Sequence, residues 1–207
     1  MAGIRVIAGL GNPGEKYRRT RHNVGAEYIF ELARQFGIPM QEESRFKGWL
    51  GRGMVYGQDV RLLVPTTYMN DSGLSLGALL RFFKLEPSQF LVCYDEVAFD
   101  PGTVKLKEDG GHNGHNGIKS VISGFGNRRD FVRLRIGVGH AGDKNKMVAF
   151  LTSVDMPASE VRLVEDALRI DRNVFEYLFA GDLQKAMTTL HAPPPAPTTE
   201  EPTDDGI

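Results

Sequence analysis

The chain alternates short apolar segments with longer segments whose apolar residues repeat at helical spacing, and this alternation restricts the fold more than any other feature. Residues 4–10, 90–94 and 131–138 are the clearest strands, because β-branched, aromatic and other apolar residues dominate them. Residues 24–36 and 72–83 have the periodicity of helices with one apolar face. The pattern predicts an α/β fold: a single-domain, three-layer sandwich with a mixed, mostly parallel central sheet flanked by helices.

The remaining segments predict further strands and helices of the same fold. Further expected elements are strands at residues 46–56, 60–64 and 102–107, and helices at residues 116–123, 157–180 and 182–191. The short connection at residues 57–59 has turn-forming residues, so the two strands that it joins should form an antiparallel hairpin. Asp71 or Ser72 is placed to cap the helix that follows.

All of these elements lie in residues 1–191, which we expect to form one domain. Residues 192–207 hold five prolines and four acids, too little apolar surface to offset ordering, so we expect a disordered tail. The tail has no Lys or Arg, which leaves the rest of the chain with a net charge of about +3. We see neither a signal peptide nor a stretch of membrane-spanning length, and expect a cytoplasmic protein with no membrane contact.

A long loop, residues 9–23, joins the first strand to the first helix. Loops of this length in a compact domain are more often functional than incidental. The loop contains four basic residues together with Asn12, Tyr17 and His22. Asn12 supplies a neutral amide, and His22 supplies the side chain whose ordinary pKa lies nearest neutrality. These are the residue types of an active site.

Polar clusters also follow other predicted strands or open predicted helices. The five clusters are Asn12, residues 17–23, residues 68–70, residues 95–96 and residues 112–116. Ligands of open α/β sheets bind beyond the strand ends, so these clusters are expected to meet in one site. A lone histidine is commonly a cap, but a carboxylate would orient His22 as a base, and Asp95 is the best candidate.

Two other kinds of site fit parts of the sequence. His112 and His115 have a metal-ligand spacing, but they lie in a glycine-rich loop without a clear further ligand set, so we expect no metal. Gly9, Gly11 and Gly14 match a dinucleotide-binding pattern, but no helix opens at the third glycine, so we expect no nucleotide cofactor. Neither a serine nor a cysteine nucleophile is indicated, because Cys93 lies within an apolar strand. Water is therefore the expected attacking group, as in ester hydrolysis.

Basic residues recur in four groups, three of which adjoin the candidate loops. They are Lys16, Arg18, Arg19 and Arg21; Lys105 and Lys107; Arg128, Arg129, Arg133 and Arg135; and Lys144 and Lys146. Tyr17 and Tyr68 lie near them, and cations with stacking rings suit the end of a single-stranded nucleic acid. An RNA-binding protein without catalytic activity is the main alternative, although it would need neither His22 nor Asp95.

Six segments, in this order, resemble those of bacterial peptidyl-tRNA hydrolases. They are GLGNPG at 9–14, TRHN at 20–23, PTTYMN at 65–70, YDE at 94–96, GHNG at 114–117 and RLRIG at 133–137. The resemblance covers nearly all of residues 4–191 and implies that they form the catalytic domain. It implies a cytoplasmic, mostly monomeric esterase that uses neither metal nor other cofactor. Its expected substrate is peptidyl-tRNA, cleaved at the ester between the peptide and the 3′-terminal ribose.

The resemblance also implies roles for individual residues. His22 would be the general base, Asp95 its orienting carboxylate, and Asn12 the contact that separates blocked from free aminoacyl groups. The residues expected to line the site for the tRNA end are Tyr17, Tyr68, Asn70 and Asn116, with His115 as a secondary hydrogen-bonding group. Lys107 and Arg135 would contact the tRNA 5′-phosphate. Two positions depart from the family: Asn113 replaces a common glycine, and Asp71 replaces an apolar residue.

Overall fold

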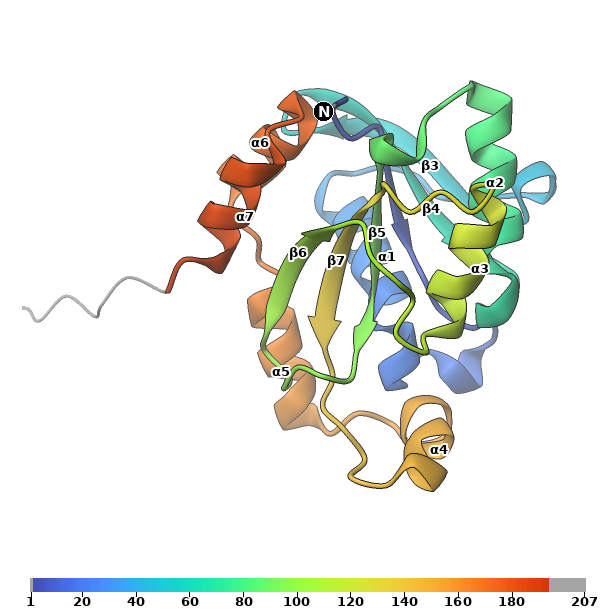
Figure 1. The fold of residues 1–207 in the computed structure, drawn as a ribbon, viewed down its shortest axis with the longest axis vertical. Helices are drawn as coiled ribbons and strands as arrows, with labels where there is room; N and C mark the ends of the chain where they lie inside the picture. Colours follow the sequence, from blue (N-terminus) through green and yellow to red (C-terminus); the bar gives the residue numbers. More distant parts are fainter. Residues whose placement is uncertain (1, 194–207) are drawn as a thin grey trace, which may run out of the picture.

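A seven-stranded sheet lies at the centre of the structure, a computed structural model that describes residues 2–193 (Figure 1). The strand order is β2 (Gln41–Glu43), β3 (Gly48–Val55), β4 (Gln58–Pro65), β1 (Val6–Gly9), β5 (Phe90–Glu96), β7 (Val132–Gly137) and β6 (Val104–Glu108). The central strands β4, β1, β5 and β7 are mutually parallel, whereas β2, β3 and β6 pair in antiparallel fashion. The expected mixed sheet and its hairpin are confirmed.

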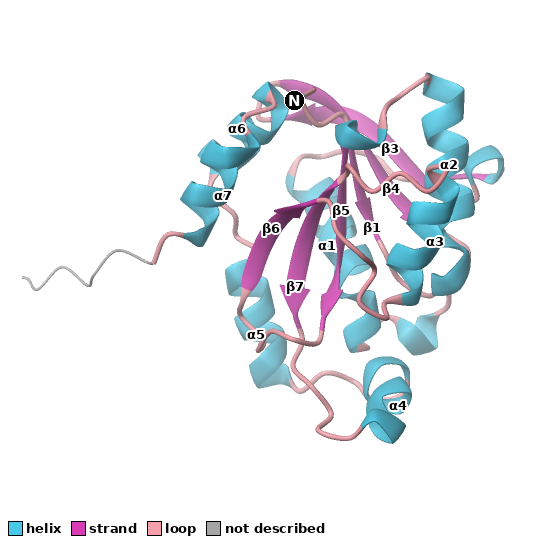
Figure 2. Ribbon diagram, in the orientation of Figure 1, coloured by secondary structure: helices cyan, strands magenta, loops and turns pink. Residues whose placement is uncertain are grey.

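Helices cover both faces of the sheet (Figure 2). One apolar core contains Ile7 and lies under α1 (Val24–Gln35), α5 (Ala158–Ala167), α6 (Arg172–Ala180) and α7 (Leu183–His191). The other contains Val6 and Ala8 and lies under α2 (Ser72–Phe83) and α3 (Asn116–Gly124). Successive strand residues point to opposite faces, so β1 contributes to both cores. The three-layer sandwich is therefore confirmed.

The single helix expected at residues 157–180 is wrong, because α5 and α6 are separate helices. Asp171 begins α6 as its N-cap, and its side chain accepts a hydrogen bond from the Asn173 N–H at 2.7 Å. The apolar pattern continues across the break because Val164 of α5 and Val174 of α6 belong to the same core.

Other local differences are small. The edge strand β2 has only exposed polar residues, and the short helix α4 (Met147–Thr152) was also not expected. The expected side-chain cap of α2 is wrong: Asp71 makes no capping bond, and the Ser72 hydroxyl donates to the Met69 carbonyl at 2.8 Å. The tail at residues 194–207 lies outside the described residues. Within the described part of the chain, no helix is long and apolar enough to cross a membrane.

Helix α1 starts against the carboxyl ends of β1 and β5. A Cβ at Gly25 would lie only 2.2 Å from the Cys93 carbonyl oxygen, so only glycine allows this approach. The Leu10 N–H donates to the same carbonyl at 3.0 Å, and the Ala26 N–H donates to the Leu10 carbonyl at 3.0 Å. The turn that precedes α1 is thereby fixed at the strand ends, and this turn carries His22.

Candidate active site

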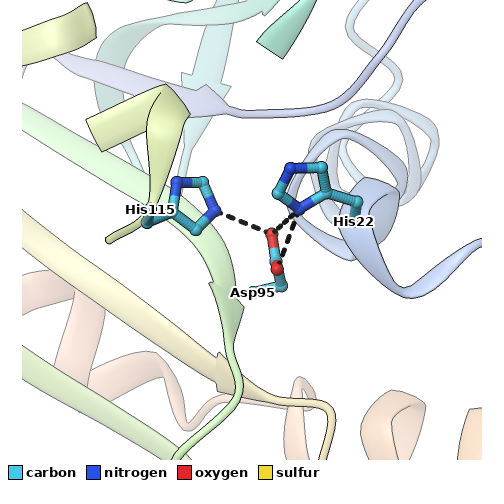
Figure 3. Close-up of side chains that lie close together, drawn as sticks. All are labelled: His22, Asp95 and His115. Carbon is cyan, nitrogen blue, oxygen red and sulfur yellow. Dashed lines mark hydrogen bonds and ion pairs between the residues drawn. The ribbon is translucent and has the colours of Figure 1, made fainter. Parts of the chain in front are cut away.

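His22 and Asp95 lie face to face at the carboxyl end of the sheet (Figure 3). His22 belongs to a 3₁₀ turn, Arg21–Asn23, and Asp95 is near the end of β5. His22 Nδ1 is 2.9 Å from each carboxylate oxygen of Asp95. The two side chains are only 11% and 1% exposed, so water screens the interaction weakly. The structure therefore brings together two residues that are 73 positions apart in the sequence.

A second imidazole binds the same carboxylate. His115 Nε2 lies 2.9 Å from Asp95 Oδ1, and His115 Nδ1 accepts a hydrogen bond from the Ile118 N–H at 3.2 Å. His115 thus begins α3 as its N-cap, and this bond places its proton on Nε2, where it donates to Asp95. The rings of His22 and His115 are tilted, with centroids 5.0 Å apart.

The shared carboxylate is held in its ionised form. Burial alone would raise the pKa of Asp95, but electrostatic attraction to His22 and His115 and their hydrogen bonds hold it well below its usual range. Burial would likewise lower the pKa of His22, but the charge and hydrogen bond of Asp95 raise it overall. An ionised carboxylate only accepts hydrogen bonds, so His22 Nδ1 carries a proton. The other ring nitrogen, Nε2, points away from Asp95 and can act as a base (Figure 3).

Asn12 is fixed from two directions. The Asn23 side chain accepts from the Asn12 N–H and donates to the Asn12 carbonyl, each at 2.9 Å. The Asn12 side-chain oxygen accepts from the Met69 N–H at 2.8 Å, which leaves its NH₂ group as the donor available to a ligand. This role of Asn23 was not predicted from the sequence, although a polar residue directly after His22 was a signal for it.

Asn70 and Asn116 line one cavity of about 500 Å³ between α2 and α3. Both side chains are exposed, and Tyr68, two residues before Asn70, is 56% exposed. Tyr17 is half-buried on a separate 3₁₀ turn, Glu15–Tyr17, beneath the Lys16 ammonium at 4.7 Å. The structure therefore brings Asn70 and Asn116 to a shared cavity and leaves Tyr17 on its own turn.

Lys107 and Arg135 lie on the same face of the β6–β7 pair. Arg135 is directly opposite Lys105, and Lys107 is directly opposite Arg133. The Arg135 guanidinium pairs with Glu96 at 2.8 Å, so part of its charge is neutralised within the protein. Lys107 takes part in none of the ion pairs formed among residues 2–193.

The residues that could hold a metal differ from the pair noted in the sequence. The exposed His112 uses its Nδ1 to accept the Gly114 N–H at 3.1 Å, whereas His115 turns toward Asp95. Within the described residues, His22, Asp95 and His115 place potential ligand atoms within 4.8 Å of one another. In the structure both imidazoles hydrogen-bond the carboxylate, which suits an acid–base role.

Known proteins resemble the chain along almost its whole length. The family model for peptidyl-tRNA hydrolase matches residues 6–199. The peptidyl-tRNA hydrolase of Shewanella loihica is 47% identical over 192 residues, which cover 93% of this chain and 98% of the relative. That of Photorhabdus laumondii is also 47% identical, with 93% and 97% covered. The crystal structure of the Acinetobacter baumannii peptidyl-tRNA hydrolase is 38% identical, with a TM-score of 0.88 over 95% of this chain and 98% of that chain. The chain belongs to the peptidyl-tRNA hydrolase family.

Proposed function

We propose that this protein hydrolyses the ester that joins a peptide, or an N-blocked aminoacyl group, to the 3′-terminal ribose of tRNA. The observation that carries the proposal is the buried pair of His22 and Asp95, in which His22 Nε2 faces away from the carboxylate. Family membership independently supports this substrate and this bond.

In the proposed reaction His22 Nε2 removes a proton from water, and the resulting hydroxide attacks the ester carbonyl carbon. Asp95 orients the ring and stabilises the imidazolium while it exists. The tetrahedral intermediate then collapses, the bond to the ribose oxygen breaks, and the imidazolium returns the proton to that oxygen. The products are a free tRNA and a peptide with a new carboxylate.

Asn12 explains how such an enzyme separates blocked from free aminoacyl groups. A blocked substrate presents a neutral amide, and the available NH₂ group of Asn12 can donate to its carbonyl oxygen. A free substrate presents an ammonium, which can only donate and finds no acceptor at this position. Asn12 therefore favours the blocked substrate without a charged partner.

The proposed contacts to tRNA divide into two groups. Asn70 and Asn116, which share a cavity, receive the tRNA 3′ end together with Tyr68 and Tyr17. In this group Asn70 donates to the substrate carbonyl or holds the attacking water, and one donor to a developing oxyanion contributes about 3 kcal/mol. Lys107 on the edge strand β6 and Arg135 on the neighbouring strand β7 share one face of the sheet and bind the 5′-phosphate of the acceptor stem. By its family resemblance the protein acts as a cytoplasmic monomer.

The test is incubation with N-acetylated and unblocked aminoacyl-tRNA, each with and without a chelator. We expect cleavage of the acetylated substrate only, at equal rates with and without the chelator. Binding of tRNA without cleavage would instead support the RNA-binding alternative. Loss of cleavage in the chelator would show that the cluster of His22, Asp95 and His115 works through a metal ion.

A further inference from the structure

Arg133 is a fully buried cation on β7 that the proposed reaction does not use. Arg133 is 1% exposed, and none of the ion pairs among residues 2–193 includes it. Its guanidinium lies over the Phe131 ring at 4.5 Å. A buried charge without a carboxylate is costly, and this cost calls for a compensating set of hydrogen bonds.

These hydrogen bonds go to the loop between β6 and α3. Arg133 Nη1 donates to the Gly111 carbonyl at 2.6 Å, and Nη2 donates to the Gly110 carbonyl at 2.5 Å. The two terminal nitrogens of the guanidinium thus hold adjacent peptide groups in a planar, two-point arrangement.

The same loop ends at His115. It runs across the sheet toward the start of α3 (Figure 1), and it is fixed over β7 by Arg133 and over β5 by the bond from His115 to Asp95. Between these points Asn113 and Gly114 have φ values of 47° and 81°. The loop has a backbone bond of its own, from the His115 N–H to the His112 carbonyl at 2.8 Å, whereas its bonds to β5 and β7 come from the side chains of His115 and Arg133.

We propose that Arg133 is a positioning residue for ester hydrolysis, which holds residues 110–111 so that His115 reaches Asp95 and orients the carboxylate toward His22. The inference rests on the proposed function, because it assigns a catalytic consequence to His115. A flexible loop would let His115 leave Asp95, and the carboxylate would lose one of the two donors that fix its plane.

The test compares Arg133→Met with Arg133→Lys in single-turnover hydrolysis. Methionine fills most of the buried volume but donates no hydrogen bond, so we expect kcat to fall about tenfold while the Kd for deacylated tRNA stays within twofold. Arg133→Lys restores one charged donor and should recover part of kcat. If Arg133→Met does not fold, Arg133→Lys is compared directly with the wild type. The control is Arg162→Met, an exposed residue on α5, which should leave kcat unchanged.

A double-mutant cycle separates positioning from a general structural effect. If Arg133 acts through His115, then Arg133→Met should reduce kcat less than twofold in a His115→Ala background. An undiminished tenfold effect in that background would overturn the inference, as would normal kcat in both Arg133 variants. Nuclear magnetic resonance of the His115 ring nitrogens tests the loop without an activity assay, and unchanged resonances in Arg133→Met would also overturn it. Failure of the wild-type protein to cleave would instead refute the proposed function.

Discussion

Replacement of Asp95 by asparagine changes the charge at the centre of the site while nearly keeping the shape. Asp95 accepts from His22 at 2.9 Å and from His115 at 2.9 Å, and its side chain is 1% exposed. An amide at this position carries no charge and also presents an NH₂ group. It can therefore turn His22 to the wrong tautomer as well as fail to stabilise the imidazolium.

The expected loss follows from the charge interaction. Two unit charges about 4 Å apart interact by about 4 kcal/mol at an effective dielectric constant of about 20. Because about 1.4 kcal/mol corresponds to a tenfold change in rate, loss of this interaction lowers kcat about a thousandfold. An accompanying change of tautomer brings the loss nearer to about 10⁴-fold, as in other histidine–carboxylate pairs. We therefore expect Asp95→Asn to lower kcat by a factor between about 10³ and about 10⁴.

The assay is single-turnover cleavage of N-acetylated aminoacyl-tRNA at saturating enzyme. Circular dichroism establishes that the variant is folded, and fluorescence anisotropy gives its Kd for deacylated tRNA, which should stay close to that of the wild type. A kcat within fivefold of the wild-type value would refute the electrostatic reasoning, because the carboxylate would then contribute less than about 1 kcal/mol.

Three further predictions concern pH, selectivity and packing. Asp95 raises the pKa of His22, and a general base must be unprotonated, so kcat should decline as the pH falls through a pKa higher than that of an ordinary histidine. A pH–rate profile whose inflection lies below the ordinary histidine pKa would contradict this prediction. Asn12→Asp removes the NH₂ donor that the Met69 contact leaves free, so kcat/KM for the blocked substrate should fall at least tenfold. In a competition assay, the ratio of kcat/KM for the blocked substrate to that for the unblocked substrate should also decrease. Gly25→Ala places a methyl group against the Cys93 carbonyl and should lower the free energy of unfolding in urea by about 1–3 kcal/mol. Gly111→Ala should not lower it, because the nearest heavy atom to its new Cβ is Asn113 Oδ1 at 3.9 Å.

The main elements could be predicted from the sequence because their periodicity is strong. Every residue of β5 is buried, and α1 and α2 each bury one apolar face, so pattern and structure agree closely. The break between α5 and α6 could not be predicted in the same way, because both helices face one core and the apolar repeat continues across it. The edge strand β2 consists of three exposed polar residues, and only its pairing with β3 identifies it.

The contact between His22 and Asp95 was predictable from the sequence, but the geometry around it was not. His22 and Asp95 could be paired by their chemistry and by their positions at strand ends. The second imidazole on Asp95 could not, because the bond from His115 depends on a loop with left-handed residues that no periodicity encodes. Arg133 was noted only as one of many cations, since burial of a strand arginine is decided by tertiary packing.

The most direct test of the account is single-turnover hydrolysis of N-acetylated aminoacyl-tRNA by His22→Ala, with tRNA binding measured on the same sample. If the imidazole removes the proton from water, cleavage should fall at least a thousandfold while the Kd for deacylated tRNA changes no more than a few fold. Cleavage within tenfold of the wild-type rate by the folded variant would contradict the account, because some other group would then activate the water.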